Sequence, residues 1–411
     1  MHRRVGVWLF GARGSVATTT VAGAAALAHG APPAGVVTEQ PAFAGAGLTP
    51  IDRLVFGGHD PSETPLSKQV ERLVAGGVLP PGLDGLIAAE LAETERNLVV
   101  LPVADTQDEL VRRMAEDIRA FRLRNDLEHV VAINVASTEP PANVGYANLA
   151  ELREALKASR VRSGQASREV SGQAGPQGSG GAGPEGSGGA GPEGSGGALP
   201  ASSLAALAAF EAGAAYVDFT PSTSIRPQVV RDWAVERGLP YGGQDAKTGE
   251  TLVKSVLAPM FTARALPVHA WSGTNLLGGG DGATLADPRA AESKSVSKER
   301  VLTELLGGEV PGEVHIDYVD PLGDWKTAWD HVMFSGFLGV RMTLQFTWQG
   351  CDSALAAPLV LDLARLSALA LERGHVGAMP FLGFYFKDPI ESTEHALTRQ
   401  YDELVRWVQE C

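Results

Sequence analysis

Buried strands alternate with helices along most of this chain, and this alternation limits the fold more than any other feature. A strand pattern over 4–10 leads through a glycine-containing turn into an Ala-, Thr- and Val-rich helix that ends near residue 28. The pattern resumes as a helix over 201–212, a strand over 214–219, a helix over 226–237 and a strand to residue 243. Repeated β-α units of this kind predict an α/β fold with a doubly wound parallel sheet.

The turn after the first strand suits a dinucleotide. Its glycines let the backbone come close to a pyrophosphate, and the N-terminus of the next helix faces the negative charge. The spacing is GxxGxxA, with Arg13 in place of the middle glycine, so a tight turn between packed elements is the alternative. We predict a Rossmann-like domain whose cofactor contacts come from Gly11, Ala12, Arg13, Gly14, Ser15 and Val16.

Two other strand ends carry polar or small residues that suit the same crevice. Asp60 follows a strand that begins near residue 53, where an acid can bind the hydroxyls of the adenosine ribose; a solvated loop aspartate is the alternative. The strand over 129–135 is followed by Ala136, Ser137 and Thr138. Short residues at the carboxyl end of a strand fit a bound dinucleotide, and they also fit an ordinary turn.

The segment GGQDAKTG at 242–249 connects a strand to a helix that runs to residue 263. Free backbone N–H groups and the positive end of the helix dipole favour an anion such as phosphate at this position. Thr248 and Gly249 are therefore candidates for binding it. A capped turn with a surface pair of Asp245 and Lys247 is the plainer interpretation.

Composition excludes several classes of partner. The formal net charge is -14, which argues against nucleic acid and anionic membranes as partners because phosphate contacts need an excess of Lys and Arg. No run approaches the ~18 apolar residues of a membrane helix. The two cysteines form no metal-binding pattern, and their scarcity fits a cytoplasmic protein. The short apolar run after Met1 is interpreted as the first strand and not as a signal peptide.

The chain of 411 residues is long enough for two domains. Three copies of an AGP(Q/E)GSGG repeat lie within 163–199, which we expect to be a disordered linker inside a domain. Residues 340–348 alternate as a half-solvated strand, whose apolar face suits either an oligomer contact or a cover from the same chain. We predict a dinucleotide-binding domain over 1–249, an inserted α+β catalytic and oligomerisation domain over 250–348, and a return to the first domain over 349–411.

Eight motifs, in order along the chain, resemble those of the myo-inositol-1-phosphate synthases, also called inositol-3-phosphate synthases. VFGGHD at 55–60 is similar to that family's VFGGWD, NVASTE at 134–139 to its TANTE segment, and GQDAKTGET at 243–251 to GDDFKSGQT. NLLGGGDG at 275–282 resembles NHLGNNDG, SKSVSK at 293–298 resembles SKEISK, and GDWK at 323–326 resembles GDSK. CDSALAAP at 351–358 resembles EDSLLAAP, and FKDP at 386–389 stands where the family has LKAP.

The resemblance implies a cytoplasmic homotetramer that holds NAD and converts glucose 6-phosphate to inositol phosphate by oxidation, enolisation, aldol closure and reduction. It implies that Lys294 and Lys326 contact the carbonyl or enolate oxygens, and that Lys387 is the proton-transfer or oxyanion lysine. Crowded ammonium groups lower one another's pKa, which lets one of them shuttle a proton near neutral pH. The resemblance also implies that Lys298, Thr248 and Gly249 bind the phosphate and that Asn275 and Leu276 contact the substrate. Asp245, Asp281 and Asp352 would orient the lysines and the sugar, or help hold a monovalent or divalent cation. The implied cofactor contacts are Asp245, Asp352 and Ser353.

The sugar-contacting loop departs from the family pattern. Leu276 replaces the family's histidine, Gly279 and Gly280 replace its paired asparagines, and Gln244 replaces the first aspartate of GDD. Retained lysines beside an altered loop leave a second hypothesis, a diverged member that cyclises another hexose phosphate such as fructose 6-phosphate. A simple NAD-dependent dehydrogenase on the same plan and a non-catalytic NAD-binding oligomer are further alternatives.

Overall fold

A seven-stranded parallel sheet forms the body of the molecule in the computed structural model, which describes residues 4–161, 198–278 and 302–410. The strand order is β11-β6-β5-β4-β1-β2-β3. The strands are β1 (Val5–Phe10), β2 (Leu54–Asp60), β3 (Leu98–Val100), β4 (His129–Asn134), β5 (Ala215–Asp218), β6 (Pro240–Gly243) and β11 (Gly377–Ala378). The strand order reverses between β1 and β4, as in doubly wound dinucleotide-binding sheets. The predicted Rossmann-like fold is therefore confirmed.

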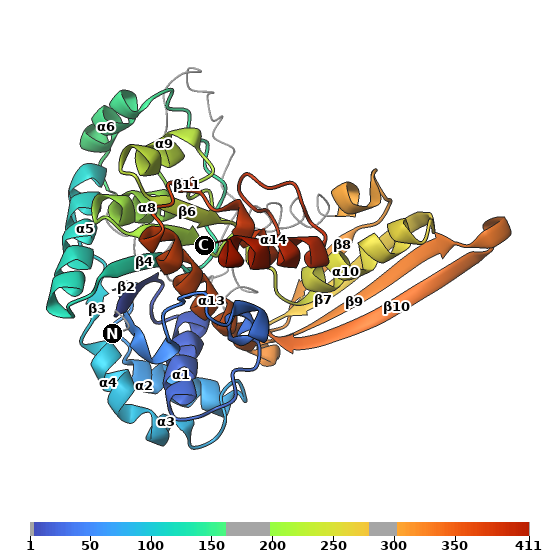
Figure 1. The fold of residues 1–411 in the computed structure, drawn as a ribbon, viewed down its shortest axis with the longest axis horizontal. Coiled ribbons are helices and arrows are strands. Elements are labelled where there is room, and N and C mark those ends of the chain that lie inside the picture. The colour runs from blue at the N-terminus through green and yellow to red at the C-terminus, as the bar shows by residue number, and fades with distance from the viewer. Residues whose placement is uncertain (1–3, 162–197, 279–301, 411) are drawn as a thin grey trace, which may run out of the picture.

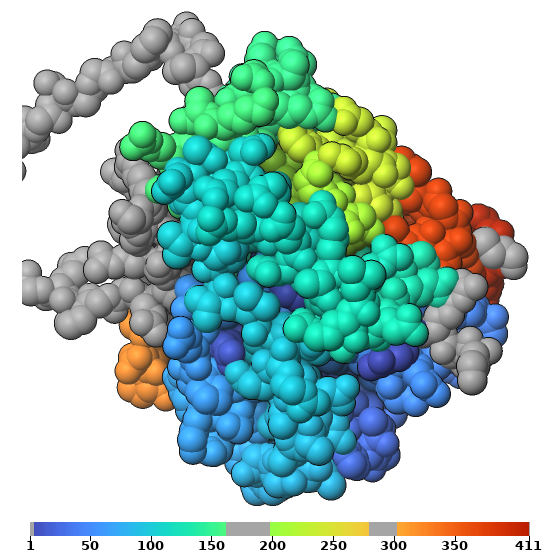
Figure 2. Space-filling view, turned by 90° about the vertical axis from the view of Figure 1, so that its left-hand side faces the viewer, coloured from blue at the N-terminus to red at the C-terminus, as the bar shows by residue number. Residues whose placement is uncertain are grey.

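Helices cover both faces of this sheet (Figure 1). One layer holds α1 (Ser15–Ala28), α2 (Leu66–Ala75), α3 (Leu83–Leu86), α4 (Ala88–Glu95), α13 (Asp352–Glu372) and α14 (Leu397–Gln409). The other layer holds α5 (Gln107–Arg124), α6 (Leu149–Ala158), α8 (Ala201–Glu211) and α9 (Gln228–Glu236). In Figure 2, α5 and α6 form much of the upper part of the visible surface, and segments of the first layer around α4 lie below them.

The sequence of β1 explains why both faces must be covered. Val5, Val7 and Leu9 enter the core under α1 and α13, whereas Trp8 and Phe10 enter the core under α5 and α8. Strands buried on both faces have continuous apolar sequences instead of alternating ones. Gly58 in β2 lets the neighbouring strand approach closely, because a Cβ there would lie 2.2 Å from the carbonyl oxygen of Leu9.

Helix α13 corrects one expectation from the sequence. Its 21 residues are long and apolar enough, by length and composition, to cross a membrane. The structure places 72% of its most apolar window inside the protein, where it packs on α1, β4 and β5. This is the pattern of a core helix. Gly374 follows the helix in the left-handed conformation (φ +67°), which is the usual way for a helix to end.

A second, four-stranded sheet projects from the body (Figure 1). Its order is β10-β9-β7-β8, and its strands are β7 (Val268–Leu277), β8 (Val314–Tyr318), β9 (Trp325–Ser335) and β10 (Arg341–Cys351). Helix α10 (Gly249–Ala263) packs on one face, where Phe261 meets Trp271 and Val332. Leu344 and Phe346 of β10 pack against this cluster, so the chain itself covers this part of the apolar face, whereas Val340 and Met342 stay 59% and 40% exposed. The other face bears the exposed Trp329.

The chain leaves the parallel sheet after β6 and returns to it after β10. Helix α13 then packs on α1, and β11 pairs with β6 in parallel. The expected linker over 163–199 lies almost wholly outside the described residues, as do Asp281, Lys294 and Lys298. Short 3-10 helices lie in the connections: η1 (Val37–Glu39), η2 (Pro41–Phe43), η3 (Ile51–Arg53), η4 (Asp320–Leu322), η5 (Phe337–Gly339) and η6 (Pro380–Tyr385).

Candidate active site

The turn between β6 and α10 is held by backbone hydrogen bonds on both sides. The N–H of Asp245 donates to the carbonyl of Thr220, after β5, at 3.1 Å. On the other side, the N–H of Lys387, after η6, donates to the carbonyl of Asp245 at 2.7 Å. Asp245 has a left-handed backbone conformation (φ +55°), which is uncommon outside glycine and often marks functional positions. The turn thus brings a carboxylate and a lysine from distant segments together.

Asp245 and Lys387 form the first ion pair of the site. Lys387 Nζ donates to Asp245 Oδ1 at 2.7 Å, and both side chains are largely buried. The plainer interpretation, a surface pair of Asp245 and Lys247, is therefore wrong. Lys247 points into the protein, where its Nζ donates to Gln400 Oε1 of α14, and burial lowers its pKa to about 7. Glu394 partly offsets this effect.

A second ion pair lies at the start of α10. Lys326, at the beginning of β9, pairs with Asp352 Oδ1, at the beginning of α13. The hydroxyl of Thr248 donates to the same carboxylate oxygen at 3.4 Å. Thr248 is the N-cap residue, but its side chain does not cap the helix. Gly249 is the first residue of α10 and has a φ of +58°. The fold thus brings together Lys326, Thr248, Gly249 and Asp352, four of the residues that the resemblance implies.

A buried carboxylate that sequence reasoning missed lies behind this turn. Asp218, at the end of β5, accepts hydrogen bonds from Asn134 Nδ2 at 3.1 Å and from Gln244 Nε2 at 2.7 Å, and from Thr220. Burial raises the pKa of Asp218 to about 6, although these donors oppose the shift. The sequence signal that could have identified Asp218 is its position, since it is an acid at the carboxyl end of a strand beside the crevice. Gln244, which replaces an aspartate of the family motif, donates a hydrogen bond to this carboxylate.

The glycine turn and the ends of β2 and β4 fit a dinucleotide. Gly11 has a φ of +83°, and a Cβ there would lie 2.7 Å from the Cα of Ala136, so the turn has room only for glycine. Gly14 precedes α1 and has no side chain to cap it, so the free N–H groups at the start of that helix could receive an anion. Asp60 accepts hydrogen bonds from the N–H groups of Arg13 and Ser62 at 2.9 and 2.8 Å. Burial raises the pKa of Asp60.

A pocket of about 490 Å³ opens beside the glycine turn after β1, between the strand ends and the helices α5 and α8. Of the predicted cofactor residues, Gly11, Ala136 and Ser137 line it, together with His59, whereas residues 12–16, Asp60 and Thr138 do not. Its other walls include Leu101, Leu110, Met114, Pro140 and Pro141. Apolar walls with a few polar groups suit a flat aromatic base. Asp352 and Ser353 do not line this pocket, because they stand at the start of α13, where Ser353 Oγ donates to Asp324 Oδ1 at 3.1 Å.

The two predicted substrate residues of β7 face opposite ways. Asn275 is buried opposite Ala328, and among the described residues its Nδ2 has no hydrogen-bond partner. Leu276 stands opposite Thr327. Because successive residues of a strand point to opposite faces, Leu276 lies on the sheet face away from Asn275 and does not join this group. Asp281, Lys294 and Lys298 lie outside the described residues.

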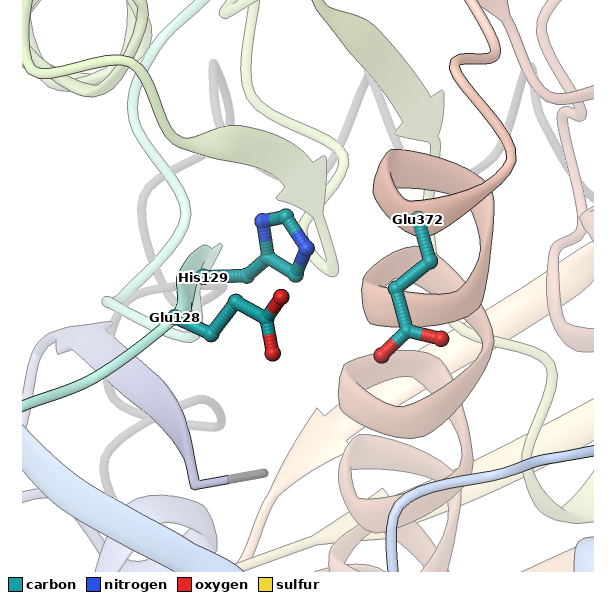
Figure 3. A group of neighbouring side chains, drawn as sticks. All are labelled: Glu128, His129 and Glu372. Atoms are coloured by element: carbon teal, nitrogen blue, oxygen red, sulfur yellow. The ribbon is translucent and has the colours of Figure 1, made fainter. Parts of the chain in front are cut away.

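One group of potential metal ligands occurs in the described part of the chain, at the other end of the sheet. Glu128 and His129, at the start of β4, point toward Glu372 at the end of α13, and the ligand atoms lie within 4.8 Å of one another (Figure 3). The candidate active site is at the carboxyl ends of the strands. These three residues therefore contribute no ligand to it.

Comparison with known proteins agrees with this geometry. A family profile described as myo-inositol-1-phosphate synthase matches residues 249–353, and a second profile with the same description, for the NAD-binding domain, matches residues 39–166. The chain is 30% identical to inositol-3-phosphate synthase 1 of Bacteroides thetaiotaomicron, over 98% of this chain and 93% of that protein. The chain belongs to the myo-inositol-1-phosphate synthase family. It is therefore an NAD-binding enzyme of that family.

More distant relatives share the fold. The inositol-3-phosphate synthase of Sesamum indicum is 28% identical over 78% of this chain, and the match spans 60% of that longer protein. The crystal structure of inositol-3-phosphate synthase from Caenorhabditis elegans superposes with a TM-score of 0.80 at 21% identity, covering 99% of this chain and 86% of that chain. A myo-inositol-1-phosphate synthase-related protein from Thermotoga maritima gives 0.74 at 23% identity, covering 98% of each chain.

The family profile over 249–353 begins at the first residue of α10 and ends at the start of α13. Within that span lie Gly249, Lys326 and Asp352, the groups of the second ion pair. Lys387 lies outside it but is fixed against Asp245 by the turn. The match and the geometry thus point to the same place in the molecule.

Lys247 predicts a pH dependence of stability. Its pKa is about 7 in the folded protein and 10.5 ordinarily, so between these values the unfolded chain keeps a proton that the folded chain has lost. Stability therefore rises with pH across this window. A Lys247→Met variant lacks this titration. Between pH 7 and 9 the free energy of unfolding of the wild type should gain about 1–2 kcal/mol relative to the variant, measured by denaturant unfolding.

The exposed Lys68, paired with Glu71 on the surface of α2, gives a matched control. The difference in stability between wild type and Lys68→Met should not change with pH. Equal pH dependence of wild type and Lys247→Met would contradict the placement of Lys247.

Proposed function

We propose that this enzyme is a redox-neutral carbocyclase that converts glucose 6-phosphate to an inositol phosphate. The observation that carries the proposal is the pair of lysine–aspartate contacts on one turn, Lys387 with Asp245 and Lys326 with Asp352. Enolisation and aldol closure place negative charge on oxygen atoms, and fixed ammonium groups stabilise such charge. Each lysine is held in place by a carboxylate, so its orientation does not depend on the substrate.

The cofactor and substrate sites lie at the same end of the parallel sheet. Gly11, Asp60 and Ala136 would hold NAD, which supplies a reversible hydride acceptor when bound. Thr248 and Gly249, at the start of α10, are placed to receive the phosphate of a sugar phosphate. Asn275 presents its buried amide on the same sheet face as Lys326.

A second candidate is a related cyclase that acts on another hexose phosphate, such as fructose 6-phosphate. Two observations favour keeping it. Leu276 turns away from the site, and Gln244 binds Asp218 instead of facing the substrate as a carboxylate. A simple dehydrogenase on the same fold differs from both cyclases because it would accumulate NADH.

Product analysis separates these functions. We expect purified protein, given glucose 6-phosphate and a catalytic amount of NAD, to form a cyclitol phosphate that carbon and phosphorus NMR identify. Fructose 6-phosphate should give no cyclised product. Turnover of fructose 6-phosphate without turnover of glucose 6-phosphate would instead select the diverged cyclase.

Lysine variants connect the activity to the site. Lys326→Met and Lys387→Met should each lower kcat/KM by about 10²–10³-fold, because each removes a charge that stabilises an oxyanion. Lys68→Met, on the exposed surface, should leave it unchanged. Unchanged activity in both site variants would refute the assignment.

We also propose that the face of the four-stranded sheet opposite α10 and the β9–β10 hairpin form subunit contacts of a homotetramer. At the tip of that hairpin, Phe337 and Leu338 are 89% and 86% exposed, and Trp329 on the face opposite α10 is 40% exposed. Exposed apolar groups of this size, gathered on one projecting element, are typical of interfaces.

The hairpin makes this assembly testable. The double variant Phe337→Ser, Leu338→Ser should shift the mass measured by light scattering from tetramer toward smaller species, because it removes apolar contact area. Val103→Ser changes an 83% exposed residue beside the parallel sheet and should leave the mass unchanged. A monomeric wild type, or a tetramer unaffected by the double variant, would contradict the proposal.

A further inference from the structure

Trp348 carries an unused hydrogen-bond donor next to the second ion pair. It lies in β10 opposite Ala328 of β9, and Gly350 lies opposite Lys326. Residues two apart on a strand share a face, so Trp348 and Lys326 are diagonal neighbours on the same side of the sheet. Nε1 of Trp348 is buried, and among the described residues it has no hydrogen-bond partner. A buried donor of this kind calls for an explanation.

Two glycines shape the space around this donor. A Cβ on Gly249 would lie 3.3 Å from Trp348 Nε1 and 2.9 Å from Lys326 Nζ. A Cβ on Gly350 would lie 2.9 Å from the same indole nitrogen. The indole N–H and the ammonium group therefore lie around one point beside the first residue of α10. A side chain at either glycine would displace them.

The groups at this point favour an anion. The indole nitrogen can only donate, and so can the ammonium group. The start of a 15-residue helix adds its positive end, which the side chain of Thr248 does not cap. The Lys326 ammonium has three N–H donors, and its ion pair with Asp352 uses one of them. An oxyanion with several acceptors, such as a phosphate group, matches this set.

We propose that Trp348 is a substrate-binding residue whose Nε1–H donates to an oxygen of the substrate's phosphate group. This inference rests on the proposed sugar-phosphate function. The site then has a hydrogen-bond donor from β10 in addition to those of α10 and Lys326. The role also explains the glycine at position 350, because a side chain there would displace the indole nitrogen. The contact forms with the phosphate and not with the reacting carbons, so its loss weakens binding more than it slows the chemical steps.

Trp348→Phe tests this contact, because it keeps an aromatic ring and removes the N–H. KM for the sugar phosphate should rise about tenfold, with kcat within about twofold and the affinity for NAD unchanged. Trp233→Phe removes an indole N–H from α9, away from the four-stranded sheet, and should change none of these values. An unchanged KM, or a loss confined to NAD binding, would overturn the proposal.

A second measurement needs no turnover, so it separates this proposal from the proposed function. In ¹⁵N-labelled protein, the indole N–H resonance that disappears in Trp348→Phe identifies Trp348. Inorganic phosphate should shift that resonance, and calorimetry should show about tenfold weaker phosphate binding to the variant. An enzyme inactive on every hexose phosphate but with this response would refute the function alone. A resonance that phosphate leaves unmoved would refute the role of Trp348.

Discussion

The contact between Asp245 and Lys387 is the constraint on which the rest of the site depends. Asp245 stands where the chain leaves the parallel sheet for the second sheet, and Lys387 follows η6, after the chain has returned to the parallel sheet. Their backbones are hydrogen-bonded as well as their side chains. A buried ion pair loses much solvation, so it is stable only when its geometry and its surroundings are fixed. Both sides of the turn supply that fixation, and the turn leads directly into α10.

A buried ionic group supports α10 from the other side. Lys254 pairs with Glu250 of the same helix and lies 3.5 Å from Asp330 of β9, and Trp271 donates to Asp330 at 2.7 Å. These contacts fix the first turns of α10 against the four-stranded sheet. The helix start, Lys326 and Trp348 therefore keep their relative positions, because charges buried in this way cannot separate without a large loss of free energy.

Local patterns predicted the parallel sheet and its two turns, the resemblance supplied the candidate lysines, and tertiary partners were not predictable. The glycine turn after β1 and the turn over 242–249 were visible because glycine and apolar periodicity are local signals. β9 was missed, since Lys326 and Asp330 lie on its buried face and hide its alternation. Helices α2–α4, α6 and α14 and the short strands β3 and β11 were also missed. Lys247 and Lys387 are equally plausible partners of Asp245 in the sequence, and only the fold shows that Lys387 is the partner.

The central claim is that one site oxidises and then reduces the same sugar phosphate. The most direct measurement follows absorbance at 340 nm and organic product together, with NAD present in equal concentration to glucose 6-phosphate. The account predicts that cyclitol phosphate forms in proportion to the sugar consumed while no net NADH appears. One NADH formed for each sugar consumed, with an uncyclised product, would contradict it.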